Sequence, residues 1–174
     1  MARPRTHPPF DPYAILAALE QERVAYILIG AFARVIVGAD EITRGVDITP
    51  SAKEENLRRL HHALETINAR SPDGSAANVQ THDYAREPVV ALRTDHGEVK
   101  VVPFPDGTRG YDDLRRAAER QPLGHGFRPS VASPGDLARM LSALGREQDI
   151  PNLIMMRRLI ELEYGLHHGL SIER

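Results

Sequence analysis

The fold is decided by residues 26–50, which read YILIGAFARVIVGADEITRGVDITP. The stretch begins with the apolar run Tyr26–Ile29, which is typical of a short buried strand. Gly30 follows directly and predicts a turn, because glycine accepts backbone conformations that other residues avoid. A helix is predicted after this turn, with Gly38 as the residue that ends it. The first half of the stretch therefore predicts a strand, a turn and a helix.

The second half of the stretch predicts another strand, which carries one carboxylate. Apolar and polar residues alternate over Val46, Asp47 and Ile48, and the run is bounded by Gly45 and Pro50. Successive side chains of a strand point to opposite faces, so Asp47 is expected on the face opposite its two apolar neighbours. One face of this strand should be buried, and the other should present the carboxylate.

Length and composition indicate one globular domain, because 174 residues suffice for a sizeable core and 41% of them are hydrophobic. The net charge of −2 argues against a broad nucleic-acid surface, although local basic patches are compatible with it. The absence of cysteine excludes disulfides and thiolate metal sites. No apolar run approaches the ~18 residues that a membrane span needs. We therefore expect a soluble cytoplasmic protein without a signal peptide or a membrane partner.

The chain is predicted to have three regions. Residues 1–10 contain several prolines and arginines and are expected to form a flexible arm. Residues 11–132 should form an α/β core, and residues 133–174 a helical segment packed on it. Capping residues and periodicity predict helices that begin near 11, 51, 111, 133 and 151, and β-branched runs predict strands at 89–92, 99–102 and within 126–132.

The order of these elements predicts an α+β fold with a mixed β-sheet, flanking helices and a C-terminal helical segment. The predicted core consists of two helical stripes and the first strand: Leu57, Leu60, Leu64, Ile67, Leu137, Met140, Leu141, Leu144, Ile27 and Ile29.

Three separated segments resemble the minimal nucleotidyltransferase superfamily and, within it, the AbiEii-type toxin proteins of bacterial toxin–antitoxin systems. They are residues 26–50, GEVKVVPFPDGTRGYDDLRRAA at 97–118 and VASPGDLARMLSALGREQD at 131–149. The family pattern is a Gly-Gly or Gly-Ser turn, a helix and then Arg-x-Thr-x-Asp-x-Asp, whose aspartates hold magnesium. Thr43 and Asp47 match this pattern. The resemblance implies a nucleotidyltransferase-like fold.

The same resemblance implies a degenerate active site. Gly45 stands where the family has its first aspartate, and Lys100 stands where it has its third carboxylate. Glu41 replaces the family's arginine, and Leu141 replaces a lysine that contacts nucleotide phosphates. Asp47 is the ancestral catalytic carboxylate that remains, and it would be a metal ligand only in an active enzyme.

Further positions that the resemblance assigns to nucleotide binding are Gly30, Ala31, Thr43, Arg44 and Arg146.

Because Asp47 is the one carboxylate that remains of the expected set, we predict that no cofactor is bound. Nucleotidyl transfer needs carboxylates that converge on two metal ions, and an ammonium group in that place repels Mg²⁺. We expect Lys100 Nζ to lie within about 4 Å of an Asp47 oxygen as its counter-ion. On the same reasoning, Gly45→Asp combined with Lys100→Asp should restore Mg²⁺ binding.

The function that these residues favour is a protein of this fold that is catalytically impaired and acts by binding. Its partner would be a nucleotide, an RNA, or a protein such as a cognate antitoxin or an active paralogue. An alternative is an active Mg²⁺-dependent nucleotidyltransferase that modifies tRNA or protein, with Asp47 and a displaced carboxylate from Glu98. Glu98 lies on the same predicted strand face as Lys100. A structural or homo-oligomeric module without nucleotide is the third hypothesis.

Overall fold

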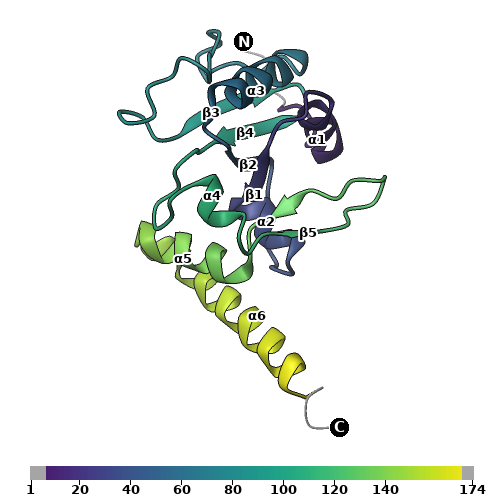
Figure 1. Cartoon of the computed structure of the whole chain (residues 1–174), viewed down its shortest axis with the longest axis vertical. Helices are drawn as coiled ribbons and strands as arrows, with labels where there is room; N and C mark the ends of the chain where they lie inside the picture. Colours follow the sequence, from purple (N-terminus) through teal and green to yellow (C-terminus); the bar gives the residue numbers. More distant parts are fainter. Residues whose placement is uncertain (1–6, 170–174) are drawn as a thin grey trace, which may run out of the picture.

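Six strands form one mixed β-sheet in the computed structural model, which describes the backbone of residues 7–169 and the side chains of residues 7–166 (Figure 1). The sheet order is β3-β4-β2-β1-β6-β5. Strand β2 is parallel to β4, and β1 is parallel to β6, whereas the other neighbours are antiparallel. The strands are β1 (Tyr26–Ile29), β2 (Gly45–Pro50), β3 (Val90–Thr94), β4 (Gly97–Val101), β5 (Glu119–Arg120) and β6 (Ser130–Val131).

Helices flank this sheet, and the predicted α+β class is confirmed. Helices α1 and α3 contact each other and β2, whereas α2 contacts β1, β2 and α5. Helix α6 contacts α5 at its start and then extends away from the sheet (Figure 1). The helices are α1 (Pro12–Gln21), α2 (Gly30–Ile36), α3 (Glu54–Thr66), α4 (Tyr111–Leu114), α5 (Pro134–Leu144) and α6 (Ile150–Gly169), with a 3₁₀ turn η1 (Glu147–Asp149).

The predicted core is confirmed for both helical stripes and for β1, with one exception. Leu60 is fully buried, and Leu64 is 3% exposed. Leu144, in contrast, is 44% exposed. It lies in the last turn of α5, directly before Gly145 ends that helix with a left-handed φ of 61°, and there it borders a cavity rather than the core.

One predicted helix is shorter than expected. The helix that begins at Tyr111 was expected to run to Glu119, but it ends at Leu114, because residues 115–117 form a turn and Glu119 then pairs with Val131 across β5 and β6. Phe10, the last residue of the predicted arm, packs edge-to-face on Phe32 with ring centroids 5.7 Å apart. Residues 1–6 of that arm lie outside the described part of the chain.

The described residues form the helices α1 to α6 and the 3₁₀ turn η1. None of those helices combines the length and the apolar character that crossing a bilayer requires.

Candidate functional site

Strand register brings Asp47 and Lys100 together. On β2, Asp47 lies opposite Ile29 of the antiparallel strand β1 and opposite Lys100 of the parallel strand β4. Its neighbours Val46 and Ile48 are fully buried, so the predicted alternation along β2 is confirmed. Both side chains line a cavity of about 340 Å³, which we call the Asp47 cavity.

The Asp47 cavity has apolar walls above a charged floor. Helix α5 provides one wall, and the chain on either side of the β3–β4 hairpin provides the other. Arg34 of α2 and Arg146, which follows α5, also line the cavity. The apolar residues of the walls are Leu137, Met140, Leu141, Leu144, Pro88, Val89, Val102, Phe104 and Pro105.

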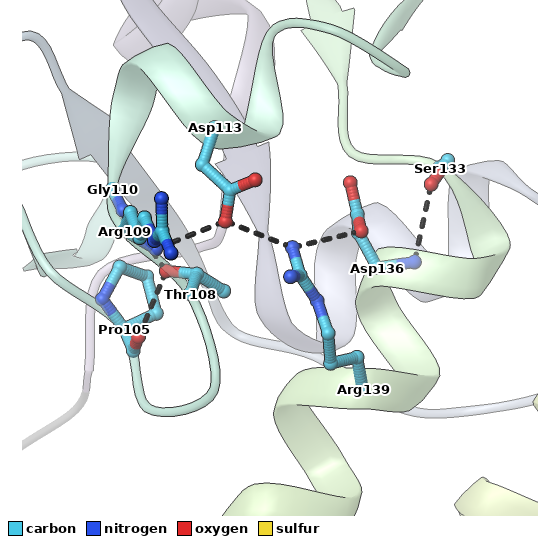
Figure 2. Close-up of polar contacts among 8 residues, drawn as sticks. All are labelled: Pro105, Thr108, Arg109, Gly110, Asp113, Ser133, Asp136 and Arg139. Atoms are coloured by element: carbon cyan, nitrogen blue, oxygen red, sulfur yellow. Dashed lines mark hydrogen bonds and ion pairs between the residues drawn. The ribbon is translucent and has the colours of Figure 1, made fainter.

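A polar network joins α4 to the helix that forms the first wall (Figure 2). Arg139 of α5 bridges two carboxylates, at 3.1 Å from Asp113 and 3.0 Å from Asp136. The same Asp113 oxygen accepts a 2.9 Å hydrogen bond from the backbone N–H of Arg109. This hydrogen bond, followed by Arg139, lowers the pKa of Asp113. The network therefore holds the 105–110 loop, which carries Pro105 into the cavity wall, against α5.

Gly30 allows the start of α2 to lie directly against Asp47. Its φ of +71° is in the left-handed region, which side chains rarely adopt. A Cβ atom at this position would overlap the Asp47 carboxylate and lie 2.9 Å from Asp47 Cβ. Glycine at the predicted turn is therefore required both by the backbone conformation and by the proximity of Asp47.

The space that a side chain would need at Gly45, which the sequence resemblance aligns with an aspartate, is filled. A Cβ atom on Gly45 would lie 2.5 Å from the carbonyl oxygen of Glu98 and 2.8 Å from Glu98 Cβ. Real Cβ atoms essentially never approach other atoms this closely. An aspartate introduced at Gly45 could therefore provide a metal ligand only if β2 or β4 shifted, because β4 lies very close to β2 at this point.

The predicted ion pair between Lys100 and Asp47 is not formed. Within residues 7–166, no carboxylate oxygen lies within 4.0 Å of Lys100 Nζ. The Lys100 side chain is exposed, whereas Asp47 is only partly exposed at the cavity floor. An exposed ammonium keeps its hydration, and a surface ion pair is worth too little to hold a long side chain in one position.

Burial raises the pKa of the Asp47 carboxyl. Loss of solvation is the largest cause, while Lys100 and Arg34 lower the pKa to a smaller extent and Glu98 raises it. Among the described residues, no hydrogen bond or ion pair to the Asp47 carboxylate is found. The ionised form of Asp47 is therefore less favourable in the folded protein than in the unfolded chain.

We expect Asp47→Asn to stabilise the protein at neutral pH. A carboxyl whose pKa is raised on folding favours the folded state at low pH and loses this contribution as the pH rises through the folded-state pKa. The gain from Asp47→Asn should therefore be largest at pH 7 and should vanish below the ordinary carboxyl pKa of 3.8. Urea unfolding of both proteins between pH 3 and pH 7 measures this difference. A variant that is less stable at pH 7 would contradict it.

Glu41, which replaces the family's arginine, forms a buried ion pair that the sequence did not reveal. Arg34 Nε and Nη2 donate to the two Glu41 oxygens at 2.7 and 2.9 Å. The two side chains are only 12% and 11% exposed. Seven residues separate them, so neither helical nor strand spacing predicts the contact. This pair places a guanidinium at the cavity and neutralises most of its charge.

The positions assigned to nucleotide binding fall into two groups. Gly30, Ala31 and Arg146 line the Asp47 cavity, and Arg146 Nε also donates to Asp149 at 2.6 Å. Thr43 instead donates its hydroxyl to the carbonyl of Gly45 within its own turn, at 3.0 Å, and does not line the cavity.

Arg44 and Glu98 line a different hollow, with Arg93.

A divalent metal does not fit the side chains present. Asp47 and Asp106 are the carboxylates in the lining of the cavity. Among the described residues, no three His, Asp or Glu side chains are close enough to hold one ion together. Mg²⁺ binds through oxygen ligands, and the residue paired with Asp47 on β4 is Lys100, whose side chain offers no oxygen.

Comparison with solved structures identifies the class of fold. The chain is similar to the lincomycin-bound lincosamide antibiotic adenylyltransferase LnuA, with a TM-score of 0.58 and 14% identity over 87% of this chain and 99% of that one. It is also similar to a candidate nucleotidyltransferase from Thermotoga maritima, with a TM-score of 0.53 and 16% identity over 83% of this chain and 88% of that one. No family model and no curated protein matches the sequence. The chain has a nucleotidyltransferase fold.

Proposed function

We propose that this protein binds a nucleotide in the Asp47 cavity without a metal ion and has lost nucleotidyl transfer. The closed space at Gly45 is the observation that carries this proposal. A nucleotidyltransferase of this type needs two carboxylates on one strand face, and here the backbone of Glu98 lies where the first would stand. A fold does not by itself establish an activity, so the proposal rests on the residues of the site.

The chemistry of the cavity supports a nucleotide as the ligand. Leu137, Met140 and Leu141 form an apolar wall on which a base would be removed from water. Lys100 also lines the cavity with an ammonium group, and charge-assisted contacts of this kind are the strong ones for phosphate. Asp47 would repel phosphate, but its raised pKa makes the neutral form easier to reach. Base and phosphate would thus find separate partners in one cavity.

The test is calorimetry with ATP, GTP, CTP and UTP, each in EDTA and in Mg²⁺. We expect at least one nucleotide to bind equally well under both conditions. Lys100→Gln should weaken that binding about tenfold or more, because a hydrogen bond to a charged group contributes about 1.5–3 kcal/mol. Arg93→Gln on the adjacent strand β3 is the matched control, since it removes one exposed cation outside the cavity.

Asp47→Asn distinguishes this proposal from the alternative enzyme. Metal-free binding predicts stronger binding by Asp47→Asn, because a negative charge next to the phosphate is removed. An active enzyme that uses Asp47 and Glu98 for Mg²⁺ predicts the opposite sign. Incorporation of labelled nucleotide into tRNA or protein that disappears in both Asp47→Ala and Glu98→Ala would establish the enzyme and overturn our proposal.

We also propose that the protein derives from AbiEii-type toxins and acts in the cytoplasm through a partner. The three sequence segments that resemble this family support the origin, and all three contribute residues to the Asp47 cavity. A cognate antitoxin, an active paralogue or a second copy of this chain are the protein partners that this origin suggests. Co-expression with a neighbouring small antitoxin gene, followed by co-purification, tests the first of them.

A further inference from the structure

A second basic site lies at the other end of β1. Arg23, Arg120 and Arg128 line a hollow of about 540 Å³ together with Tyr26, and we call it the arginine hollow. Arg23 belongs to the turn between α1 and β1, Arg120 is in β5, and Arg128 lies just before β6. The pairing of Arg120 with Ser130 brings the last two together, and Arg120 Nη1 donates to the Arg128 carbonyl at 3.4 Å.

The arginine hollow has positive charge that the protein does not neutralise by ion pairs. Within the described part of the chain, none of its three guanidinium groups lies within 4.0 Å of a carboxylate. Glu20 is the acidic residue in its lining. Three cations and one anion around a concave surface favour a ligand with more than one negative charge.

Tyr26, which also lines this hollow, carries a hydrogen-bond donor that no described residue uses. The residue is 9% exposed, and its hydroxyl is buried without a hydrogen-bond partner among the described residues. Burial raises the pKa of Tyr26, so the hydroxyl keeps its proton at neutral pH. Buried donors are almost always satisfied. An anionic oxygen or a water bound between Tyr26 and the arginines would accept a hydrogen bond from the Tyr26 hydroxyl.

A smaller hollow shares one lining residue with the arginine hollow and another with the Asp47 cavity. It has a volume of about 280 Å³, and its charged lining residues are Lys53, Arg109 and Asp112; we call it the bridging hollow. Phe104 lines both the bridging hollow and the Asp47 cavity, and Tyr111 lines both the bridging hollow and the arginine hollow. The bridging hollow therefore borders each of the other two sites at an aromatic side chain.

We propose that these three hollows form one track that binds a single-stranded nucleic acid. Cations that follow the backbone, interrupted by aromatic side chains on which bases stack, are what such ligands require. Phe104 is 56% exposed, so its ring is accessible to a base. A duplex keeps its bases stacked inside and cannot offer them to these rings. Placement of the terminal nucleotide in the Asp47 cavity rests on the proposed function.

Fluorescence anisotropy with labelled 12-nucleotide oligo(U) tests the track on the full chain. We expect the triple variant Arg23→Gln, Arg120→Gln, Arg128→Gln to weaken binding tenfold or more. It should also reduce the slope of log K against log salt by about 2, because each phosphate that the protein neutralises on a single strand contributes about 0.7 to this slope. Phe104→Ala should weaken binding about fivefold or more, the low end of the stacking range, and leave the salt slope unchanged.

The matched control is the triple variant Arg70→Gln, Arg86→Gln, Arg93→Gln, which removes the same charge from exposed positions outside the track. It should change oligo(U) binding less than twofold. An equal loss in both triple variants would mean non-specific attraction of a polyanion and would overturn the proposal. Equal affinity for a 12-base-pair duplex, or an unchanged affinity in the Arg23 triple variant, would overturn it as well.

The outcome also separates the track from the proposed function. UTP binding should be unaffected in the Arg23 triple variant, because UTP would occupy the Asp47 cavity alone. If no nucleotide binds the wild-type protein but the Arg23 triple variant still weakens oligo(U) binding, nucleotide binding in the Asp47 cavity is rejected and the nucleic-acid track is supported. If UTP binds normally but the Arg23 triple variant binds oligo(U) as well as the wild-type protein does, the nucleic-acid track is rejected and nucleotide binding in the Asp47 cavity is supported. Oligo(dT) as a second probe shows whether the 2′-hydroxyl contributes.

Discussion

Gly45→Asp is expected to lower the free energy of unfolding by about 1–3 kcal/mol, the usual cost of inserting atoms into a packed site. The new Cβ would lie 2.5 Å from the Glu98 carbonyl oxygen, so β2 or β4 must shift. Replacing a strand glycine ordinarily has the opposite sign, since it reduces the freedom of the unfolded chain by about 0.4–1 kcal/mol. Urea unfolding followed by circular dichroism measures the difference.

Gly45→Ala is the control that isolates the cause. It adds the Cβ alone. If the close approach to Glu98 causes the destabilisation, Gly45→Ala should show most of it. If the aspartate charge causes it, Gly45→Ala should show little. A neutral or stabilising Gly45→Ala would contradict the close approach of β4. In Gly45→Asp with Lys100→Asp, we expect Mg²⁺ affinity to stay weak despite two added carboxylates, because the first cannot take its place without moving the backbone.

Leu64→Ala is expected to cost about 2–5 kcal/mol, the largest effect of any single substitution proposed for this protein. Leu64 is 3% exposed on α3 and belongs to the core cluster of buried residues. Removing its side-chain atoms leaves a cavity that the sheet cannot fill without distortion. The destabilisation should be visible as a lower urea midpoint at an unchanged slope.

Leu162→Ala provides the comparison at an exposed helical position. Leu162 is 63% exposed on α6, so its truncation should change stability by less than about 0.5 kcal/mol. Equal destabilisation at Leu64 and Leu162 would mean that the stripe on α3 is not a core stripe. The pair separates the effect of burial from the effect of replacing leucine in a helix.

The elements that carry Gly30 and Asp47 could be predicted from the sequence, because the relevant patterns are local. The apolar run Tyr26–Ile29, the glycine at position 30 and the alternation around Asp47 each determine the conformation of their own residues. The face on which Asp47 lies follows from the period of a strand. Gly30 was therefore placed correctly after β1, and Asp47 on the face of β2 opposite Val46 and Ile48.

The chemistry of the cavity depended on distances between segments that are far apart in the chain. The close approach of Glu98 to Gly45 arises from parallel pairing of β2 with β4, and no local pattern encodes how close two paired strands come. The same register aligns Lys100 with Asp47, yet the exposed ammonium forms no ion pair with it.

Two further features were decided by the tertiary structure alone. In the sequence, Glu41 was only a departure from the pattern of the resembling family. In the structure, it forms a largely buried ion pair with Arg34. The arginines of the second hollow come from a turn, β5 and the chain before β6, and each alone resembles an ordinary surface cation. Local sequence determines which face of an element a side chain occupies, whereas packing between elements determines which side chains meet and what space remains between them.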